Sequence, residues 1–231
     1  MTQYNAKKEW ERLYGPESRI AYPAEGVIRI LKGTFPTLSM PKPTEGNILD
    51  LGCGDGRHFP LFAQSDLDAF GTEISNEICT NVSANLSKSG IPFENIKTGT
   101  ADNIPYDDSY FDYLLTWNSC YYMSATKSLD FSLHVDEMCR VLKKDAWIIA
   151  SIPKKTSFIF NESIPHDNPG YQIIAKDPFN LRNGEILKCF DDCKELEDAF
   201  SKRFYSFSHA DINMSWFGLN YHWHVFVAQK K

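Results

Sequence analysis

The sequence predicts an α/β fold, in which a mostly parallel sheet carries helices on both faces. Residues 48–51, 113–117 and 147–150 are mostly apolar runs of strand length, as expected of parallel strands buried on both faces. Stretches with helical periodicity separate these runs, which is the order of a βαβ chain. A glycine-rich turn follows the first run, and open α/β sheets bind their ligands at the carboxyl ends of their strands. We therefore expect a ligand site at that edge.

The glycine-rich turn narrows the choice of ligand. Residues 47–56 read Asn-Ile-Leu-Asp-Leu-Gly-Cys-Gly-Asp-Gly, and a helix is expected from Arg57 to Ala63. Glycines let the backbone turn sharply and approach a ligand, and the free N–H groups of the helix start point at it. A dinucleotide loop, Gly-x-Gly-x-x-Gly, needs a glycine at position 57, and the Gly-Lys-Ser/Thr of a Walker loop is also missing.

Composition favours a soluble single domain. The 231 residues are 42% hydrophobic and 14% aromatic, which is enough for one substantial core. The net charge of −6 argues against a surface that binds nucleic acid. We expect no membrane segment, because no apolar run approaches about 20 residues. The six cysteines are scattered without a zinc-site spacing, so we expect no metal site and a reducing, cytoplasmic location.

The chain before the glycine turn is expected to be helical over residues 6–32. Trp10 and Tyr14 lie one turn apart and share a face, and Gly15-Pro16 interrupts the helix. A second helix is expected from Ala24 to Leu31. These aromatic side chains either cap the sheet or cover a ligand.

A second strand, residues 67–74, also ends in an acid. Glu73 lies 23 residues after Asp50, close to the offset of about 20 residues at which an acid binds ribose hydroxyls in doubly wound folds. A carboxylate suits that task because it accepts two hydrogen bonds from a vicinal diol. A helix is expected over residues 76–89, with Gly90 at its end.

The third strand, residues 95–100, precedes a second motif. Residues 101–106 read Ala-Asp-Asn-Ile-Pro-Tyr, and Phe111-Asp112 leads into the fourth strand. An acid after strand three, then Ile-Pro-aromatic, then Phe-Asp resembles the class I S-adenosylmethionine (SAM)-dependent methyltransferases, as does Asp-x-Gly-x-Gly-x-Gly at residues 50–56. The resemblance spans about residues 45–153 and is specific as a set of motifs.

The resemblance implies a Rossmann-like fold with SAM as cofactor and S-adenosylhomocysteine (SAH) as product. Glu73 would then bind the ribose, Asp102 the adenine amino group, and the segment after strand four the methionine portion. The cofactor residues that we predict are Tyr14, Tyr22, Asp50, Gly52, Cys53, Gly54, Arg57, Glu73, Ile74, Ala101, Asp102, Asn103, Trp117 and Asn118.

Residues 116–123 follow strand four and lack two motifs of nucleic-acid methylases. They contain no Asn/Asp-Pro-Pro-Tyr/Phe, and Cys120 follows a serine rather than the proline that cytosine C5 chemistry requires. Together with the acidic charge, this predicts a small-molecule acceptor and no nucleic-acid partner.

The remaining chain is expected to complete a seven-stranded sheet. A helix over residues 127–143 leads into strand five at 145–153, and residues 154–192 form an irregular insertion over the acceptor. A helix at 193–204 and strands at about 204–214 and 221–228 follow. The single domain thus divides into an N-terminal cover (1–44), a SAM-binding core (45–153), an insertion (154–192) and a last helix with two strands (193–231).

Methyl transfer requires little acid–base chemistry, because the methyl group of SAM is already activated. A general base is needed only for a nucleophile with a high pKa, and the sequence does not rank the candidates. His222 and His224 share a strand face, but no third metal ligand is evident. The candidate catalytic residues are His58, Tyr121, Tyr122, His166 and His222.

We therefore expect a cytoplasmic methyltransferase of the EC 2.1.1 type, acting as a monomer or homodimer. Its acceptor would be an oxygen or nitrogen of a small polar metabolite, with a sugar or surface-polysaccharide precursor as one class. Two alternatives remain open. One is a SAM-fold binding or regulatory subunit without turnover, and the other is an NAD-dependent oxidoreductase, disfavoured by Arg57 at the third glycine position.

Overall fold

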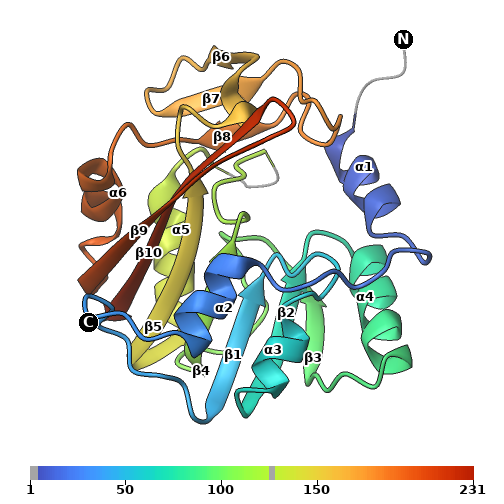
Figure 1. Ribbon diagram of the computed structural model, residues 1–231. Helices are drawn as coiled ribbons and strands as arrows, with labels where there is room; N and C mark the ends of the chain where they lie inside the picture. Colours follow the sequence, from blue (N-terminus) through green and yellow to red (C-terminus); the bar gives the residue numbers. More distant parts are fainter. Residues whose placement is uncertain (1–4, 125–127) are drawn as a thin grey trace.

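The computed structural model describes residues 5–124 and 128–231, and it shows the predicted α/β fold (Figure 1). A seven-stranded sheet runs in the order β3-β2-β1-β4-β5-β10-β9. Its strands are β1 (Gly46–Leu51), β2 (Leu67–Glu73), β3 (Asn95–Thr98), β4 (Phe111–Trp117), β5 (Leu142–Pro153), β9 (Phe204–Trp216) and β10 (Leu219–Lys230). The helices are α1 (Ala6–Leu13), α2 (Glu25–Lys32), α3 (Phe59–Ala63), α4 (Asn76–Lys88), α5 (Phe131–Val141) and α6 (Cys193–Phe200).

The sheet is parallel except at one side. β1 pairs in parallel with β2 and β4, and β4 pairs in parallel with β5. β10 is antiparallel to both β5 and β9, because β9 and β10 form a hairpin. The prediction of a mostly parallel, seven-stranded sheet is confirmed.

Helices cover both faces of the sheet. The core on one face joins α2, α3 and α4 to the sheet, through side chains such as Val27, Phe62 and Val82. The core on the other face contains the apolar sides of α5 and α6, including Met138 and Phe200. Burial on both faces explains why the central strands are continuous apolar runs.

Several elements are shorter than predicted, and among them β3 ends at Thr98 rather than at residue 100 and α6 ends at Phe200 rather than at residue 204. The helix after the glycine turn begins at Phe59 rather than Arg57, because Gly56 has a positive φ of 78° and Phe59 N–H closes a turn on its carbonyl. The helix expected over 127–143 is α5, which begins after the N-cap Asp130 and ends at Val141. Its next residue, Leu142, is already extended in β5, and residue 127 lies outside the described residues.

The insertion is more regular than predicted. It contains a short 3₁₀ turn (Phe158–Phe160) and a second sheet of three antiparallel strands, β6 (Ser163–Pro165), β7 (Tyr171–Ile174) and β8 (Ile186–Lys188). Strands of three or four residues, separated by Pro169-Gly170 and by a loop, are too short to show an alternating pattern. The small sheet lies beyond the carboxyl ends of the parallel strands, at the top of Figure 1 beside the hairpin tip. The insertion therefore stands at the edge where a ligand is expected.

Helix α1 stands beside the insertion at the same edge (Figure 1). It ends before Gly15 and α2 begins after Ala24, as the break at Gly15-Pro16 predicts. Within the described residues, no helix has the length and apolar character needed to cross a membrane.

Candidate functional site

The glycine turn, residues 52–56, forms a loop at the carboxyl end of β1. Gly52, Gly54 and Gly56 all have positive φ, at 76°, 59° and 78°. The N–H groups of Gly52 and Cys53 donate to the carbonyl of Thr72, which ties the loop to β2. A Cβ at Gly52 would lie 2.5 Å from the Cβ of Ser119, so the loop passes directly against the segment after β4. Glycine is required here by both conformation and space.

Glu73 ends β2 and holds this loop. Its Oε1 accepts from the N–H of Gly54 at 2.8 Å, and its Oε2 accepts from the N–H of Ile74 at 2.9 Å. The side chain is buried, and burial raises the pKa of the carboxyl from 4.5 to about 7, although both N–H groups act in the opposite direction. The carboxyl is therefore poised to titrate near neutral pH.

Asp50 and His58 form a buried pair beneath the loop. Asp50 Oδ2 lies 2.9 Å from His58 Nδ1, and both residues are at most 4% exposed. Within the described residues, Asp50 Oδ1 and His58 Nε2 have no hydrogen-bond partner. Unpartnered buried polar atoms are costly and point to a missing partner such as a ligand or water.

Tyr14 covers the loop from the N-terminal segment. A Cβ at Gly54 would lie 2.9 Å from its hydroxyl, and burial raises the pKa of that phenol. Asn81 on α4 donates to the carbonyl of Tyr14 and fixes the end of α1. Tyr14 therefore sits where the sequence analysis places a cover over the cofactor.

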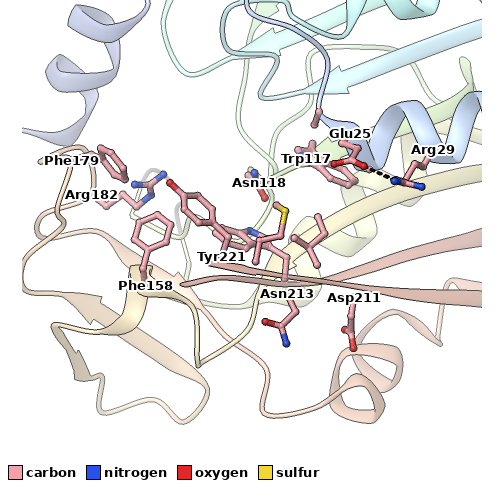
Figure 2. Close-up of a pocket in the computed structure, with 15 residues that line it drawn as sticks. Glu25, Arg29, Trp117, Asn118, Phe158, Phe179, Arg182, Asp211, Asn213 and Tyr221 are labelled. Carbon is pink, nitrogen blue, oxygen red and sulfur yellow. Dashed lines mark hydrogen bonds and ion pairs between the residues drawn. The ribbon is translucent and has the colours of Figure 1, made fainter. Parts of the chain in front are cut away.

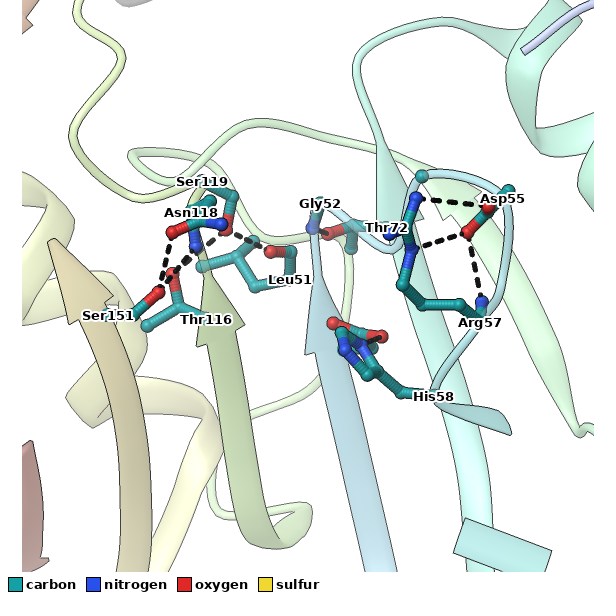
Figure 3. Close-up of polar contacts among 12 residues, drawn as sticks. Leu51, Gly52, Asp55, Arg57, His58, Thr72, Thr116, Asn118, Ser119 and Ser151 are labelled. Carbon is teal, nitrogen blue, oxygen red and sulfur yellow. Dashed lines mark hydrogen bonds and ion pairs between the residues drawn. The ribbon is translucent and has the colours of Figure 1, made fainter. Parts of the chain in front are cut away.

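Asp55 and Arg57 close the outer side of the loop (Figure 3). The guanidinium of Arg57 pairs with the Asp55 carboxylate at 2.9 Å, and the Ala21 N–H donates to Asp55 Oδ2. The next residue, Tyr22, turns away: its side chain is 92% exposed and lines a separate cavity beside α2 and α3. The structure therefore does not bring Tyr22 to the glycine loop, in contrast to Tyr14.

The turn after β3 is closed on itself. The Thr100 hydroxyl donates to Asp102 Oδ1 at 2.6 Å, and the Asn103 N–H donates to the carbonyl of Thr100. The turn lies next to the end of β2, since the Gly99 N–H donates to the carbonyl of Glu73. Ala101, Asp102 and Asn103 are thus at the same edge as Glu73.

The segment after β4 is tied to both neighbouring strands (Figure 3). Asn118, with a φ of 61°, donates its N–H to the hydroxyl of Ser151 on β5, and its side-chain oxygen accepts from that hydroxyl. The Ser119 hydroxyl donates to the carbonyl of Leu51 and lies 2.9 Å from the Thr116 hydroxyl. These contacts hold Trp117 and Asn118 beside the glycine loop.

A cavity of about 500 Å³ opens at Trp117 and Asn118 (Figure 2). Its other walls are the start of α2, the paired strands of the β9–β10 hairpin and the insertion, which contributes Arg182. It lies next to the segment that contacts the glycine loop.

Arg182, whose contacts with Tyr122 and Trp10 the sequence does not predict, links the cavity to α1. Its Nε donates to the Tyr122 hydroxyl at 2.9 Å, its Nη1 pairs with the buried Asp177, and it lies 5.5 Å from the centroid of the Trp10 ring. Trp10 stacks on Tyr14, so the insertion and the cover over the loop are connected. No local sequence pattern signals a contact between residues so far apart.

The structure does not bring the five candidate catalytic residues together. His58 is occupied by Asp50, His166 lies beside β6 with its Nδ1 accepting from the Asn168 N–H, and His222 lies 3.0 Å from the Thr156 hydroxyl. Tyr121 and Tyr122 stack on each other, and burial raises the pKa of both phenols. Within the described residues, none of the five lines the cavity.

No third ligand beside His224 is evident in the sequence, but the structure brings Cys193 and Asp211 to it. The ligand atoms of these three residues all lie within 4.8 Å of one another. The ammonium of Lys154 already pairs with Asp211 at 2.6 Å. We therefore interpret this group as a polar cluster, on the face of the hairpin opposite the aromatic side chains of the pocket.

The residues around the glycine loop fit SAM. Because Gly52 and Gly54 have no Cβ, Ser119 and Tyr14 can lie directly against the backbone of the loop. The Glu73 carboxylate has the lone pairs that a ribose diol requires. The unpartnered Asp50 Oδ1 adds a buried acceptor below the loop. Glu73 and Asp102 both stand at the edge where the sequence analysis places the nucleoside.

Comparison with known proteins supports the same interpretation. Residues 49–150 match the family model described as a methyltransferase domain. An uncharacterized methyltransferase of Bacillus subtilis (strain 168), YcgJ, is 24% identical over 143 residues, which are 62% of this chain and 53% of the relative. The chain thus spans about half the length of this curated relative.

Solved structures share the fold. A SAM-dependent methyltransferase from Methanosarcina mazei has a TM-score of 0.65 at 19% identity, over 91% of this chain and 99% of its own. A protein of Thermotoga maritima described as a SAM-dependent methyltransferase and possible histamine N-methyltransferase has a TM-score of 0.57 at 20% identity. The match covers 97% of this chain and 95% of the other. Residues 49–150 therefore match a methyltransferase domain, the fold is that of solved SAM-dependent methyltransferases, and the cofactor that these similarities indicate is SAM.

Proposed function

We propose that the protein is an enzyme that transfers the methyl group of SAM to an oxygen or nitrogen of a small polar metabolite. The supporting observation is one of position: the glycine loop and Glu73 stand at the edge of the sheet where the 500 Å³ cavity opens at Trp117. Cofactor residues and an acceptor-sized cavity on adjacent strands are what methyl transfer requires.

Each residue of the loop has a proposed task. Glu73 binds the ribose hydroxyls, and Asp102 accepts from the adenine amino group. Asp50 and His58 fix the start of the loop, because their buried pair joins β1 to α3. Tyr14 excludes water from above, where it lies against Gly54.

SAM supplies a methyl group already activated by the positive charge on sulfur, and transfer to the acceptor lone pair leaves SAH and releases the acceptor proton. The protein then needs mainly to align the acceptor atom with the methyl group and to exclude water. Trp117 and Asn118 are held for this purpose by α2 and by Ser151. A sugar or surface-polysaccharide precursor is one class of acceptor compatible with the cavity volume.

All six cysteines are free thiols, which supports the proposal of a cytoplasmic location. A monomer or homodimer remains our proposal for the assembly.

Calorimetry of the purified protein with SAM, SAH and NAD tests the cofactor. We expect SAM and SAH to bind and NAD not to bind, with binding lost in Asp50→Ala and Glu73→Ala variants that circular dichroism shows to be folded. Binding of NAD alone would contradict the proposal in favour of an oxidoreductase. SAH binding without methylation of any acceptor would favour a regulatory subunit.

The affinity for SAH is expected to fall as pH is lowered through about 7. The pKa of Glu73 in the free protein is raised to about 7 by burial, and a protonated carboxyl offers the ribose diol one acceptor fewer. Binding that requires the ionised form loses about tenfold in affinity for each pH unit below that pKa and is constant above it.

The stability of the free protein is expected to depend on pH in the opposite direction to the affinity for SAH. Because the folded pKa of Glu73 is raised from 4.5, the contribution of this group to stability is full below pH 4.5 and is lost as pH rises through about 7. Calorimetric Kd values for SAH between pH 5.5 and 8.5 test the first statement. A Kd that stays constant over this range would contradict it.

A further inference from the structure

The cavity beside Trp117 is walled by aromatic rings (Figure 2). Tyr221 and Trp223 project from β10 on the same face of the hairpin and stack with centroids 5.5 Å apart at 21°. Phe158 from the insertion packs on Tyr221 with centroids 4.7 Å apart, and Phe179 lies beyond it. Rings from the hairpin and the insertion therefore form one continuous wall.

Trp117 forms part of another wall and is fixed in place. It ends β4, and a Cβ on Gly26 of α2 would overlap its ring, so the helix packs directly on the indole. A rigid ring loses little conformational entropy when a ligand stacks on it. The cavity thus offers ring surfaces from β4 and from the hairpin.

Several polar groups of the lining are paired with neighbouring side chains, although the Trp223 Nε1–H has no partner within the described residues. Arg29 donates to the Glu25 carboxylate through Nε and Nη2, and Arg182 contacts Tyr122 and Asp177. The Asn118 side-chain oxygen accepts from the Ser151 hydroxyl. A pyranose buried here would lack partners for many of its hydroxyls, and each unpaired polar group opposes binding.

The charges of the lining cancel. Among the described residues that line the cavity, Arg29 pairs with Glu25 and Arg182 with Asp177, while the Asp211 carboxylate pairs with Lys154 on the other face of the hairpin. A charged ligand would therefore find no free opposite charge among these lining residues. The histidines predicted as bases also lie outside the lining, which favours an acceptor whose proton is more acidic than that of a sugar hydroxyl.

We propose that the acceptor is an uncharged molecule with a flat aromatic or heteroaromatic ring, methylated on a ring hydroxyl or a nitrogen. The ring lies against the Tyr221–Trp223 wall, with Trp117 as its other contact. This inference rests on the proposed function, because it treats the cavity as the acceptor pocket. It selects phenols and nitrogen heterocycles over sugars.

A matched pair of ligands tests whether binding requires an aromatic ring. We expect 2-naphthol to bind the full chain at least tenfold more tightly than decahydro-2-naphthol, which has the same skeleton and hydroxyl but no aromatic face. Methyl glucoside, 2-naphthoate and 1-naphthylmethylamine are expected to bind at least tenfold more weakly than 2-naphthol. Calorimetry or ligand-observed NMR, with and without saturating SAH, gives each Kd.

Two variants test whether 2-naphthol binds in this cavity. Tyr221→Leu is expected to weaken 2-naphthol binding at least fivefold and to leave the Kd for SAH unchanged. The same substitution at Tyr205, which is 42% exposed on β9 and outside the cavity lining, is expected to change neither value. Both variants are first checked for a native melting temperature.

The outcomes separate the two proposals. Equal binding of 2-naphthol and its saturated analogue, tighter binding of methyl glucoside or of a charged probe, or equal effects of the two variants would overturn the aromatic acceptor. Failure of SAH to bind the folded protein would instead overturn the proposed function, because the ligand pair is compared without SAH as well.

Discussion

Replacing Glu73 with glutamine is expected to lower the affinity for SAH at pH 8 by at least about 100-fold. Hydrogen bonds to a charged group contribute about 1.5–3 kcal/mol each, so loss of two to the ribose diol costs about 3 kcal/mol or more. The amide also presents an N–H₂ group where Glu73 now accepts from both Gly54 and Ile74. One of these N–H groups then faces a donor, and the loop is loosened as well.

A matched control separates this effect from loss of an acid in general. Glu94→Gln makes the same change at an exposed position before β3 and is expected to leave the Kd for SAH unchanged. The pH dependence supplies a second readout, since Glu73→Gln should bind SAH with a Kd that no longer changes between pH 6 and 8. A variant that keeps wild-type affinity at pH 8 would show that Glu73 does not bind the cofactor.

Local sequence patterns are sufficient to predict most of the parallel sheet. β1 follows from the apolar run 48–51 and the glycines after it, and Glu73 follows from the spacing to Asp50. Both predictions depend only on residues that are close in the chain and on strands that are buried on both faces. The edge of the sheet at which the glycine loop and Glu73 meet then follows from the parallel order of β1 and β2.

The cavity beside Trp117 depends on contacts that no local sequence pattern encodes. Trp10 and Arg182 meet across the molecule, and Tyr221 faces the cavity because β10 pairs with β9 in one particular register. The strands of the insertion are also too short to give a periodic signal. His58 illustrates the reverse case, because its position at a helix start suggests a base, whereas tertiary packing pairs it with Asp50.

Replacing Gly52 with alanine is expected to abolish measurable SAH binding and to lower the free energy of unfolding by about 2–5 kcal/mol. A positive φ costs a residue with a Cβ about 1–2 kcal/mol, and Gly52 has a φ of 76°. Its new Cβ would also lie 2.5 Å from the Cβ of Ser119, and overpacking of this kind costs about 1–3 kcal/mol more. Urea unfolding of the free protein and calorimetry with SAH measure the two effects separately.

Gly90→Ala isolates the backbone part of this cost. Gly90 follows α4 with a φ of 65°, and a Cβ there would meet no atom within 4 Å. This variant should therefore lose about 1–2 kcal/mol and bind SAH with the wild-type Kd. The difference between the two variants measures the close contact between the glycine loop and the segment after β4. Equal losses of stability, with SAH binding retained in both, would mean that the loop can move away from Ser119 without consequence for the cofactor.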